Sequence, residues 1–299
     1  MKKVKAGIVQ ATPVLFNIQK TVDKVIDLIE AGTRKGCNLL VFPESFIPGY
    51  PRGLAFDTVV GRRGNSGRDL WHLFAANSIV VGDQFCRQIG EAVKKAEVFL
   101  VLGVTEKDEI NGTLYCSILF FNETGKIVGK HRKLKPTGTE RILWGEGDGS
   151  TLNVVETSFG KLGGLICWEN LMPLARMTLY QQGVQIYVAP TADSRDTWTS
   201  TLVHIACEGR CFVIGCNQFV TKADYPDFLQ EEIGKEPDIL CRGGSAIVSP
   251  LGEVLAGPVY NKETILVAEI DMAEVAKSKF DFDVIGHYAR NDVFDFRKK

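Results

Sequence analysis

The sequence of 299 residues lacks the features of membrane and exported proteins. No run approaches about 18 consecutive apolar residues, the length that a membrane-spanning helix needs, so we expect no membrane partner. The opening, MKKVKAGIVQATPV, has only a short apolar stretch before Gln10 and Thr12, too short for the apolar region of a signal peptide. We therefore expect a cytoplasmic protein.

The sequence also lacks an excess of charge of one sign. Its 35 Lys and Arg residues nearly balance 36 Asp and Glu residues, which gives a net charge of −1 at pH 7. Proteins that bind nucleic acid through phosphates carry a basic surface, so we expect no nucleic-acid partner. A content of 45% hydrophobic and 24% charged residues is typical of globular proteins and excludes a disordered or collagen-like chain.

No pattern of disulfide or metal-binding cysteines is present. The eight cysteines are scattered through apolar runs in a chain too long to need disulfides, so we expect mostly buried thiols in a reducing compartment. His204, Cys207, Cys211 and Cys216 are zinc-ligand residue types, but Cys216 lies in an apolar strand-like run, so we expect no metal. The glycine-rich stretches GRRGNSG and GEGDG match no phosphate-binding loop, so we expect no nucleotide cofactor.

Short apolar runs alternate with amphipathic stretches along the whole chain, which indicates an α/β protein. We expect strands at 4–10, 37–43, 98–104, 186–190 and 212–218, helices at 17–36, 85–96, 173–182 and 197–209, and hairpins at 114–132 and 244–259. Residues 45–68 predict a long irregular segment, with a helix starting near Ser66 or Asp69. No linker interrupts the pattern, so we expect a single domain over 1–299 with a C-terminal tail from about residue 271.

Three polar side chains follow the ends of apolar strands. Glu44 follows LLVFP, Lys133 follows KIVGKHR, and Cys167 follows LGGLI. In open α/β sheets such strand ends meet at one crevice. A thiol is a good nucleophile only when a base takes its proton, and an ammonium group stabilises negative charge that develops beside it. The three residues therefore predict a catalytic set, with backbone N–H groups near Trp168 and Asn170 available for an anion.

The segments VFPES, HRKLKPT with ERILWGEGDG, and GGLICWEN resemble, in this order, the three signatures of the nitrilase superfamily. The resemblance extends over essentially the whole chain, from KAGIVQATP to GHYARNDVF. It implies that Glu44 is the general base, Lys133 the catalytic lysine and Cys167 the nucleophile. Glu140 resembles the second active-site glutamate, which supports the lysine.

Lys135 is the alternative to Lys133 within the same segment. The lysine of the family directly follows a pair such as His131-Arg132, and this favours Lys133.

The residues CWEN, KLKPT and WGEGDG resemble the nitrilase branch of the superfamily, whereas amidase and carbamoylase branches usually have Tyr-Asp after the cysteine. The resemblance implies hydrolysis of an organic nitrile by water to a carboxylic acid and ammonia, with no cofactor. The open alternatives are an amidase or ω-amidase acting on a carboxamide, a cyanide-hydrolysing enzyme and, least favoured, a non-catalytic scaffold.

The residues expected to contact the substrate are the aromatic side chains of Tyr50, Trp144 and Trp168, together with Asn170. The shape of the pocket should depend on loops 45–75 and 190–200. The resemblance further implies a four-layer α-β-β-α sandwich and a homo-oligomer, at least a dimer, in which the C-terminal tail contributes contacts.

Overall fold

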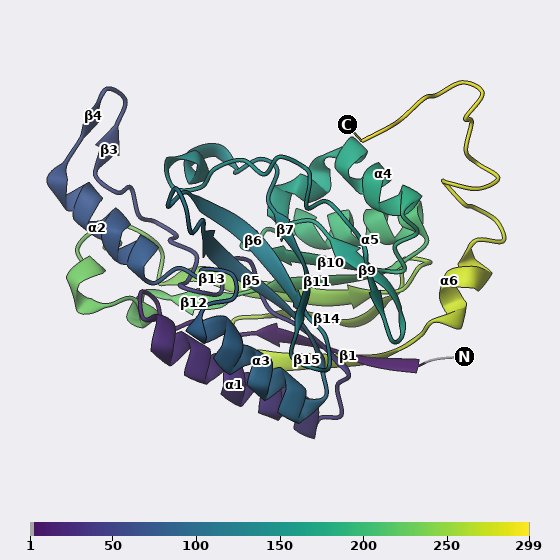
Figure 1. Cartoon of the computed structure of the whole chain (residues 1–299), viewed down its shortest axis with the longest axis horizontal. Helices are drawn as coiled ribbons and strands as arrows, with labels where there is room; N and C mark the ends of the chain where they lie inside the picture. The colour runs from purple at the N-terminus through teal and green to yellow at the C-terminus, as the bar shows by residue number, and fades with distance from the viewer. Residues whose placement is uncertain (1–2, 299) are drawn as a thin grey trace.

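Two β-sheets pack face to face between two layers of helices in the computed structural model, which describes residues 3–298 (Figure 1). Helices α1 (Ile18–Arg34) and α3 (Gln84–Ala96) cover the outer face of one sheet. Helices α4 (Pro173–Gln181) and α5 (Thr197–Gly209) cover the outer face of the other. The arrangement is a four-layer α-β-β-α sandwich and confirms the predicted fold class.

The first sheet has six strands in the order β15-β1-β2-β5-β6-β7. Neighbours β1, β2 and β5 are parallel, whereas β15, β6 and β7 pair antiparallel at the two sides. The predicted hairpin at 114–132 is formed by β6 and β7. The bounds are β1 (Lys3–Gln10), β2 (Leu39–Val41), β5 (Phe99–Lys107), β6 (Leu114–Phe121), β7 (Ile127–Arg132) and β15 (Thr264–Asp271).

The second sheet has the strand order β12-β13-β11-β10-β9-β8, and β14 pairs with β13. Strands β9, β10 and β11 are parallel, and the predicted hairpin at 244–259 is formed by β13 and β14. The bounds are β8 (Val155–Thr157), β9 (Gly160–Gly164), β10 (Ile186–Thr191), β11 (Phe212–Asn217), β12 (Phe219–Thr221), β13 (Ile239–Val248) and β14 (Val254–Tyr260).

The central strands are apolar at every position because both of their faces are buried. In β2, Val41 packs between the two sheets, while Leu40 packs under α1 and α3. In β10, Val188 packs between the sheets, while Tyr187 packs under α4 and α5. Successive side chains of a strand point to opposite faces, so a short continuous apolar run fills two layers of the core at once.

The helices begin at residues whose side chains cap them. Asn17 accepts from the backbone N–H of Lys20, and Asp83 accepts from that of Cys86, so each satisfies a backbone donor in the first turn. Helix α1 ends at Arg34, just before the predicted limit of residue 36, where Gly36 takes a positive φ of 80°. Among the helices of residues 3–298, none has the combined length and apolar character needed to cross a membrane.

The segment predicted to be irregular contains more order than expected. Residues Thr58–Val59 (β3) and Arg62–Arg63 (β4) form a small hairpin, and helix α2 (Asn65–Ala76) follows, close to its predicted start. Figure 1 shows β3, β4 and α2 projecting from one end of the sandwich. Strands of two residues carry no periodicity that a sequence pattern could reveal.

The C-terminal tail follows β15 and the short helix α6 (Ala273–Ser278). Figure 1 shows it extending away from the sandwich and returning to α4. Near its end, the Gln181 side chain donates to the Phe296 carbonyl at 3.5 Å, and the Lys298 ammonium donates to the Leu152 carbonyl at 3.2 Å. The tail therefore contacts the α4 side of the molecule through polar groups.

A close backbone approach places the segment that carries Glu44. A Cβ atom built on Gly103 of β5 would lie 1.9 Å from the Pro43 carbonyl oxygen, so only glycine allows this contact. The Gly103 carbonyl accepts the Phe46 N–H at 2.8 Å. The chain after β2 is thereby held against β5, with the Glu44 side chain fully buried.

Candidate active site

The Lys133 ammonium lies between two carboxylates in the interior of the protein. Its Nζ donates to Glu44 Oε1 and to Glu140 Oε2, each at 2.7 Å. The side chains of Lys133 and Glu44 are fully buried, and that of Glu140 is nearly so. The structure thus brings together Glu44, Lys133 and Glu140, three of the four predicted catalytic residues. The fourth, Cys167, lines the same pocket as Glu140.

These residues come from both sheets, which differs from the single open-sheet crevice used to predict them. Glu44 follows β2 and Lys133 follows β7 in the first sheet, whereas Cys167 follows β9 in the second. The strand ends still meet because the two sheets face each other.

Glu44 is held by its backbone and by one of its two carboxylate oxygens. Gln218 Nε2 donates to its carbonyl at 2.7 Å, and the Cys116 thiol donates to Oε1 at 3.4 Å. The other oxygen, Oε2, is buried and has no hydrogen-bond donor among residues 3–298. Ionised carboxylates are acceptors, so this oxygen is available to accept a proton.

Glu140 is fixed at the start of the short 3₁₀ helix η1 (Gly138–Ile142). Its Oε2 accepts the Thr137 N–H at 2.7 Å in addition to Lys133, and its Oε1 accepts the Tyr50 hydroxyl at 2.8 Å. With these donors in place, Glu140 can orient Lys133 but has little freedom to move.

Cys167 begins a second 3₁₀ helix, η2 (Cys167–Leu171), just before α4. Its φ is 52°, a left-handed conformation that costs a non-glycine residue about 1–3 kcal/mol. The Thr191 hydroxyl donates to its sulfur at 3.2 Å. The sharp turn from β9 into η2 holds the thiol in the pocket wall, with the Trp168 backbone at the first turn beside it.

Glu169 connects the segment of Cys167 to the segment of Lys133, a role that sequence analysis missed. Its carboxylate accepts the Ile166 N–H at 2.8 Å and the Leu134 N–H at 2.6 Å. It also lies 3.0 Å from His131 Nε2. Ile166 directly precedes Cys167, and Leu134 directly follows Lys133, so one buried carboxylate fixes the two turns relative to each other.

Burial dominates the ionisation of the site. Burial, reinforced by the charge of Glu44 and opposed by Lys133, raises the pKa of Cys167 to about 12, so the thiol is protonated at neutral pH. Burial also raises the pKa of Glu44, although Lys133 opposes this shift. For Lys133, burial favours the neutral amine, but the charge of Glu44 and its neighbours raises the pKa well above its usual range.

The pocket that contains Cys167 has a volume of about 280 Å³. As expected, its walls come from the loop around residue 50 and from residues 192–195. It is lined by Tyr50, Arg52, Thr137, Glu140, Cys167, Trp168, Ala192, Asp193, Ser194 and Arg195. The polar residues Arg52, Asp193 and Arg195 were missed, because only their position in space distinguishes them from other loop residues.

Two of the four predicted contact residues, Tyr50 and Trp168, line this pocket. Trp144 is buried behind Tyr50, with ring centroids 5.7 Å apart, and its indole N–H donates to Thr105. Asn170 is also buried, and its amide donates to the carbonyls of Leu165 and Cys167. Trp144 and Asn170 therefore support residues of the pocket and are not among its lining.

The alternative lysine and the alternative metal residues lie elsewhere. Lys135 is half exposed and pairs with Glu146 at the surface. His204 is exposed, whereas Cys216 is buried and donates to the Val41 carbonyl at 3.2 Å. Within residues 3–298, no three His, Cys, Asp or Glu side chains are placed to hold a metal ion.

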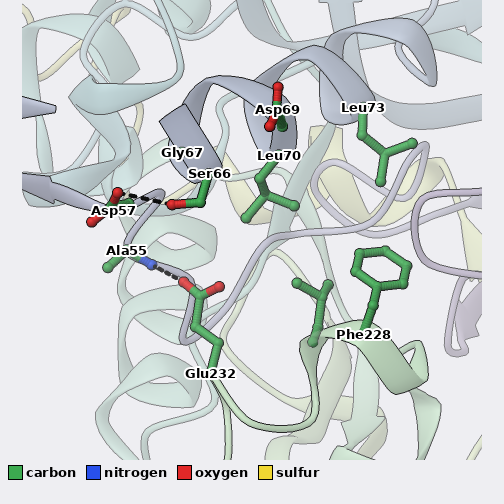
Figure 2. A pocket seen from close by; sticks show the side chains of 10 residues that line it. Ala55, Asp57, Ser66, Gly67, Asp69, Leu70, Leu73, Phe228 and Glu232 are labelled. Carbon is green, nitrogen blue, oxygen red and sulfur yellow. Dashed lines mark hydrogen bonds between the residues drawn. The ribbon is translucent and has the colours of Figure 1, made fainter. Parts of the chain in front are cut away.

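A larger cavity of about 620 Å³ lies between α2 and residues 228–232 (Figure 2). The Ser66 hydroxyl donates to Asp57 at 2.8 Å, and the Glu232 carboxylate accepts the Ala55 N–H at 2.9 Å. Figure 2 shows both hydrogen bonds as dashed lines. The residues that line it include carboxylates and apolar side chains but no thiol and no cation. It therefore differs from the smaller pocket, where the thiol of Cys167 and the carboxylate of Glu140 lie together.

The chain matches a known protein family over most of its length. Residues 5–280 match the carbon-nitrogen hydrolase family. The chain belongs to the carbon-nitrogen hydrolase family. The predicted resemblance to this superfamily is thereby confirmed, and with it the prediction of a hydrolase acting on carbon-nitrogen bonds.

Individual members of this hydrolase family resemble the chain over nearly its full length. It is 48% identical to an aliphatic nitrilase of Sinorhizobium fredii, over 98% of this chain and 95% of that protein. It is 46% identical to a bifunctional nitrilase/nitrile hydratase of Nicotiana tabacum, over 97% of this chain and 84% of that protein. The crystal structure of a carbon-nitrogen hydrolase of Helicobacter pylori matches with a TM-score of 0.76 at 24% identity, over 98% and 97% of the two chains.

Replacing Glu169 by Ala tests whether this carboxylate joins the two turns. The change leaves the buried Ile166 N–H and the partly buried Leu134 N–H without an acceptor, at up to about 1–3 kcal/mol each. We expect the free energy of unfolding, measured with denaturant, to fall by at least about 2 kcal/mol. The variant protein that remains folded should also have a lower kcat. The control is Glu156→Ala, an exposed partner of Lys161, which should change stability by less than about 0.5 kcal/mol. Equal stability of the two variants would contradict the role of Glu169.

Proposed function

We propose that this hydrolase is a nitrilase that converts an organic nitrile to the carboxylic acid and ammonia. The observation that carries the proposal is the Lys133 ammonium held between Glu44 and Glu140 beside the buried thiol of Cys167. The 46–48% identity to proteins named as nitrilases supports the same reaction. In this proposal Cys167 is the nucleophile, Glu44 the general base, Lys133 the stabiliser of charge and Glu140 its support.

In the first step the sulfur of Cys167 attacks the nitrile carbon. Because burial raises the thiol pKa to about 12, the proton must leave as the carbon-sulfur bond forms. The unpartnered Oε2 of Glu44 accepts it and passes it to the nitrogen, whose bond to carbon is reduced from triple to double. The product is a thioimidate. Lys133 and the backbone N–H of Trp168 stabilise the charge on nitrogen as the bond order falls.

In the second stage water hydrolyses the thioimidate. Glu44 removes one proton from the water as its oxygen bonds to carbon, and the nitrogen takes up this proton. Transfer of the remaining hydroxyl proton to nitrogen in this tetrahedral species then lets the carbon-nitrogen bond break, which releases ammonia and leaves a thioester. A second water adds in the same way and releases the acid and the thiol. If the tetrahedral species expels the thiol in place of ammonia, the product is the amide. The Nicotiana tabacum relative is named for both outcomes, so we extend the proposal to an amide by-product.

Lys133 has to keep its proton throughout the cycle. Two carboxylates within hydrogen-bond distance raise its pKa well above the usual range, so it remains a cation at every working pH. A buried ammonium with fixed partners does not need to reorganise when charge develops beside it, which is the basis of electrostatic stabilisation of a transition state.

We also propose a single domain over residues 1–299, located in the cytoplasm, that assembles at least into a dimer. Exposed apolar side chains on the α4 side, Leu171 and Leu174, and in the tail, Phe280 and Phe294, support assembly through these elements. A monomeric mass of the full chain by light scattering would contradict the proposed dimer.

A panel of nitriles and their matching amides tests the reaction. We expect release of ammonia and acid from nitriles, with no turnover by Cys167→Ala. Loss of one anion-stabilising donor typically lowers kcat by about 10²–10³-fold, so we expect Lys133→Ala to lower kcat by at least that factor. Lys135→Ala is the matched control and should stay within about threefold of the wild type, because its ammonium pairs with Glu146 at the surface. Turnover of amides alone would identify an amidase, and turnover of neither would favour the scaffold.

The pH dependence of kcat/KM tests the role of Glu44 as the base. Glu44 acts only when ionised, and burial raises its pKa, so activity should fall toward acid with a midpoint above the usual glutamate range. Because the thiol ionises only near pH 12 and Lys133 keeps its proton, activity should be constant through neutral and mildly alkaline pH. A rise in activity centred between about pH 8 and 9, as an ordinary thiol would give, contradicts this assignment.

A further inference from the structure

Arg52 carries a charge in the wall of the Cys167 pocket that no carboxylate within residues 3–298 neutralises. Its guanidinium donates to the Ala192 carbonyl through Nη2 and lies 5.5 Å from the centre of the Tyr50 ring. It has no ion-pair partner in the described part of the chain, although much of its side chain is buried. An unpaired cation in a poorly solvated site is costly, and most of its five N–H donors remain unused.

The other charges of the pocket are already matched. Arg195 is paired with Asp193 through both Nε and Nη2, at 2.9 and 2.5 Å. Lys133 is paired with Glu44 and Glu140. The Tyr50 hydroxyl donates to Glu140 while its ring faces Arg52, so Tyr50 contacts both that carboxylate and the guanidinium. Among the residues lining the pocket, the cation left for a ligand is Arg52.

The size of the pocket limits what that ligand can be. Its volume of about 280 Å³ is below the usual range of about 300–1,000 Å³ for small-molecule sites. The pocket therefore suits a short substrate better than a bulky one. The planar guanidinium matches a carboxylate in shape and charge and can donate two parallel hydrogen bonds to it.

We propose that Arg52 binds a substrate carboxylate, so that the preferred substrates are short aliphatic nitriles that carry a carboxylate group. This inference rests on the proposed nitrilase function and adds the class of substrate to it. Arg52 is then a specificity-determining residue, while the chemistry at the nitrile stays with Cys167, Glu44 and Lys133.

The first experiment measures kcat/KM of the wild type for cyanoacetate, 3-cyanopropanoate and 4-cyanobutanoate against their methyl esters. At least one acid should be preferred over its ester by roughly 10- to 100-fold, the discrimination expected of a buried charge-assisted hydrogen bond. Equal rates for every acid and ester pair, or preference for the esters, would overturn the inference.

The second experiment compares Arg52→Gln and Arg52→Lys with Arg195→Gln on the best acid and its ester. Arg52→Gln should lose roughly 10- to 100-fold in kcat/KM for the acid, mainly through KM, with much less change for the ester. Arg52→Lys should recover part of the loss because it keeps the charge. Arg195→Gln should not be selective for the acid, because Asp193 already neutralises Arg195. An equal loss on acid and ester by Arg52→Gln would show a purely structural role.

Calorimetric binding to Cys167→Ala separates this inference from the proposed reaction. We expect Cys167→Ala to bind 3-cyanopropanoate in preference to its ester, and the double variant with Arg52→Gln to lose this preference. That result supports the carboxylate site even if the wild type hydrolyses no nitrile. Nitrile turnover by the wild type without selective binding of any of the three acids keeps the nitrilase and overturns the role of Arg52.

Discussion

The ion pair of Lys133 with Glu44 and Glu140 is the interaction on which the site depends. It joins the end of β2, the end of β7 and the helix η1 at one buried point, with both distances at 2.7 Å. Removing one partner of such a cluster leaves an uncompensated buried charge, which typically costs about 3–5 kcal/mol. The same contacts that hold the loops together keep Lys133 charged and leave Glu44 Oε2 free to accept a proton.

The opposite sheet supplies the thiol, and the fold has to hold the two sheets in register for the chemistry to work. The apolar layer between the sheets sets their separation, and Glu169 fixes the local geometry through the N–H groups that flank Cys167 and Lys133. A thiol kept protonated by burial is unreactive until a nitrile and the base are both present. In the proposed reaction, this arrangement protects Cys167 until a nitrile binds and Glu44 can act as its base.

The sequence predicts most of the strands and the main helices, because buried strands appear as short apolar runs. It also singles out Glu44, Lys133 and Cys167, because each follows such a run. Glu140 came from the family resemblance. The sequence did not single out Arg52 or Glu169. Arg52 stands out because it has no carboxylate partner among residues 3–298, and Glu169 because it accepts backbone N–H groups from two distant segments. Trp144 and Asn170 lie beside the expected motifs, but their side chains face the interior, a choice that adjacency in sequence does not determine.

The most direct test of the account is to identify the covalent intermediate. The protein is quenched with acid during turnover of a nitrile and digested, and the peptides are examined by mass spectrometry. We expect an adduct on the peptide of Cys167, with the mass of the nitrile for the thioimidate or of the acyl group for the thioester. An adduct on any other residue, in protein that turns over the nitrile, would contradict it.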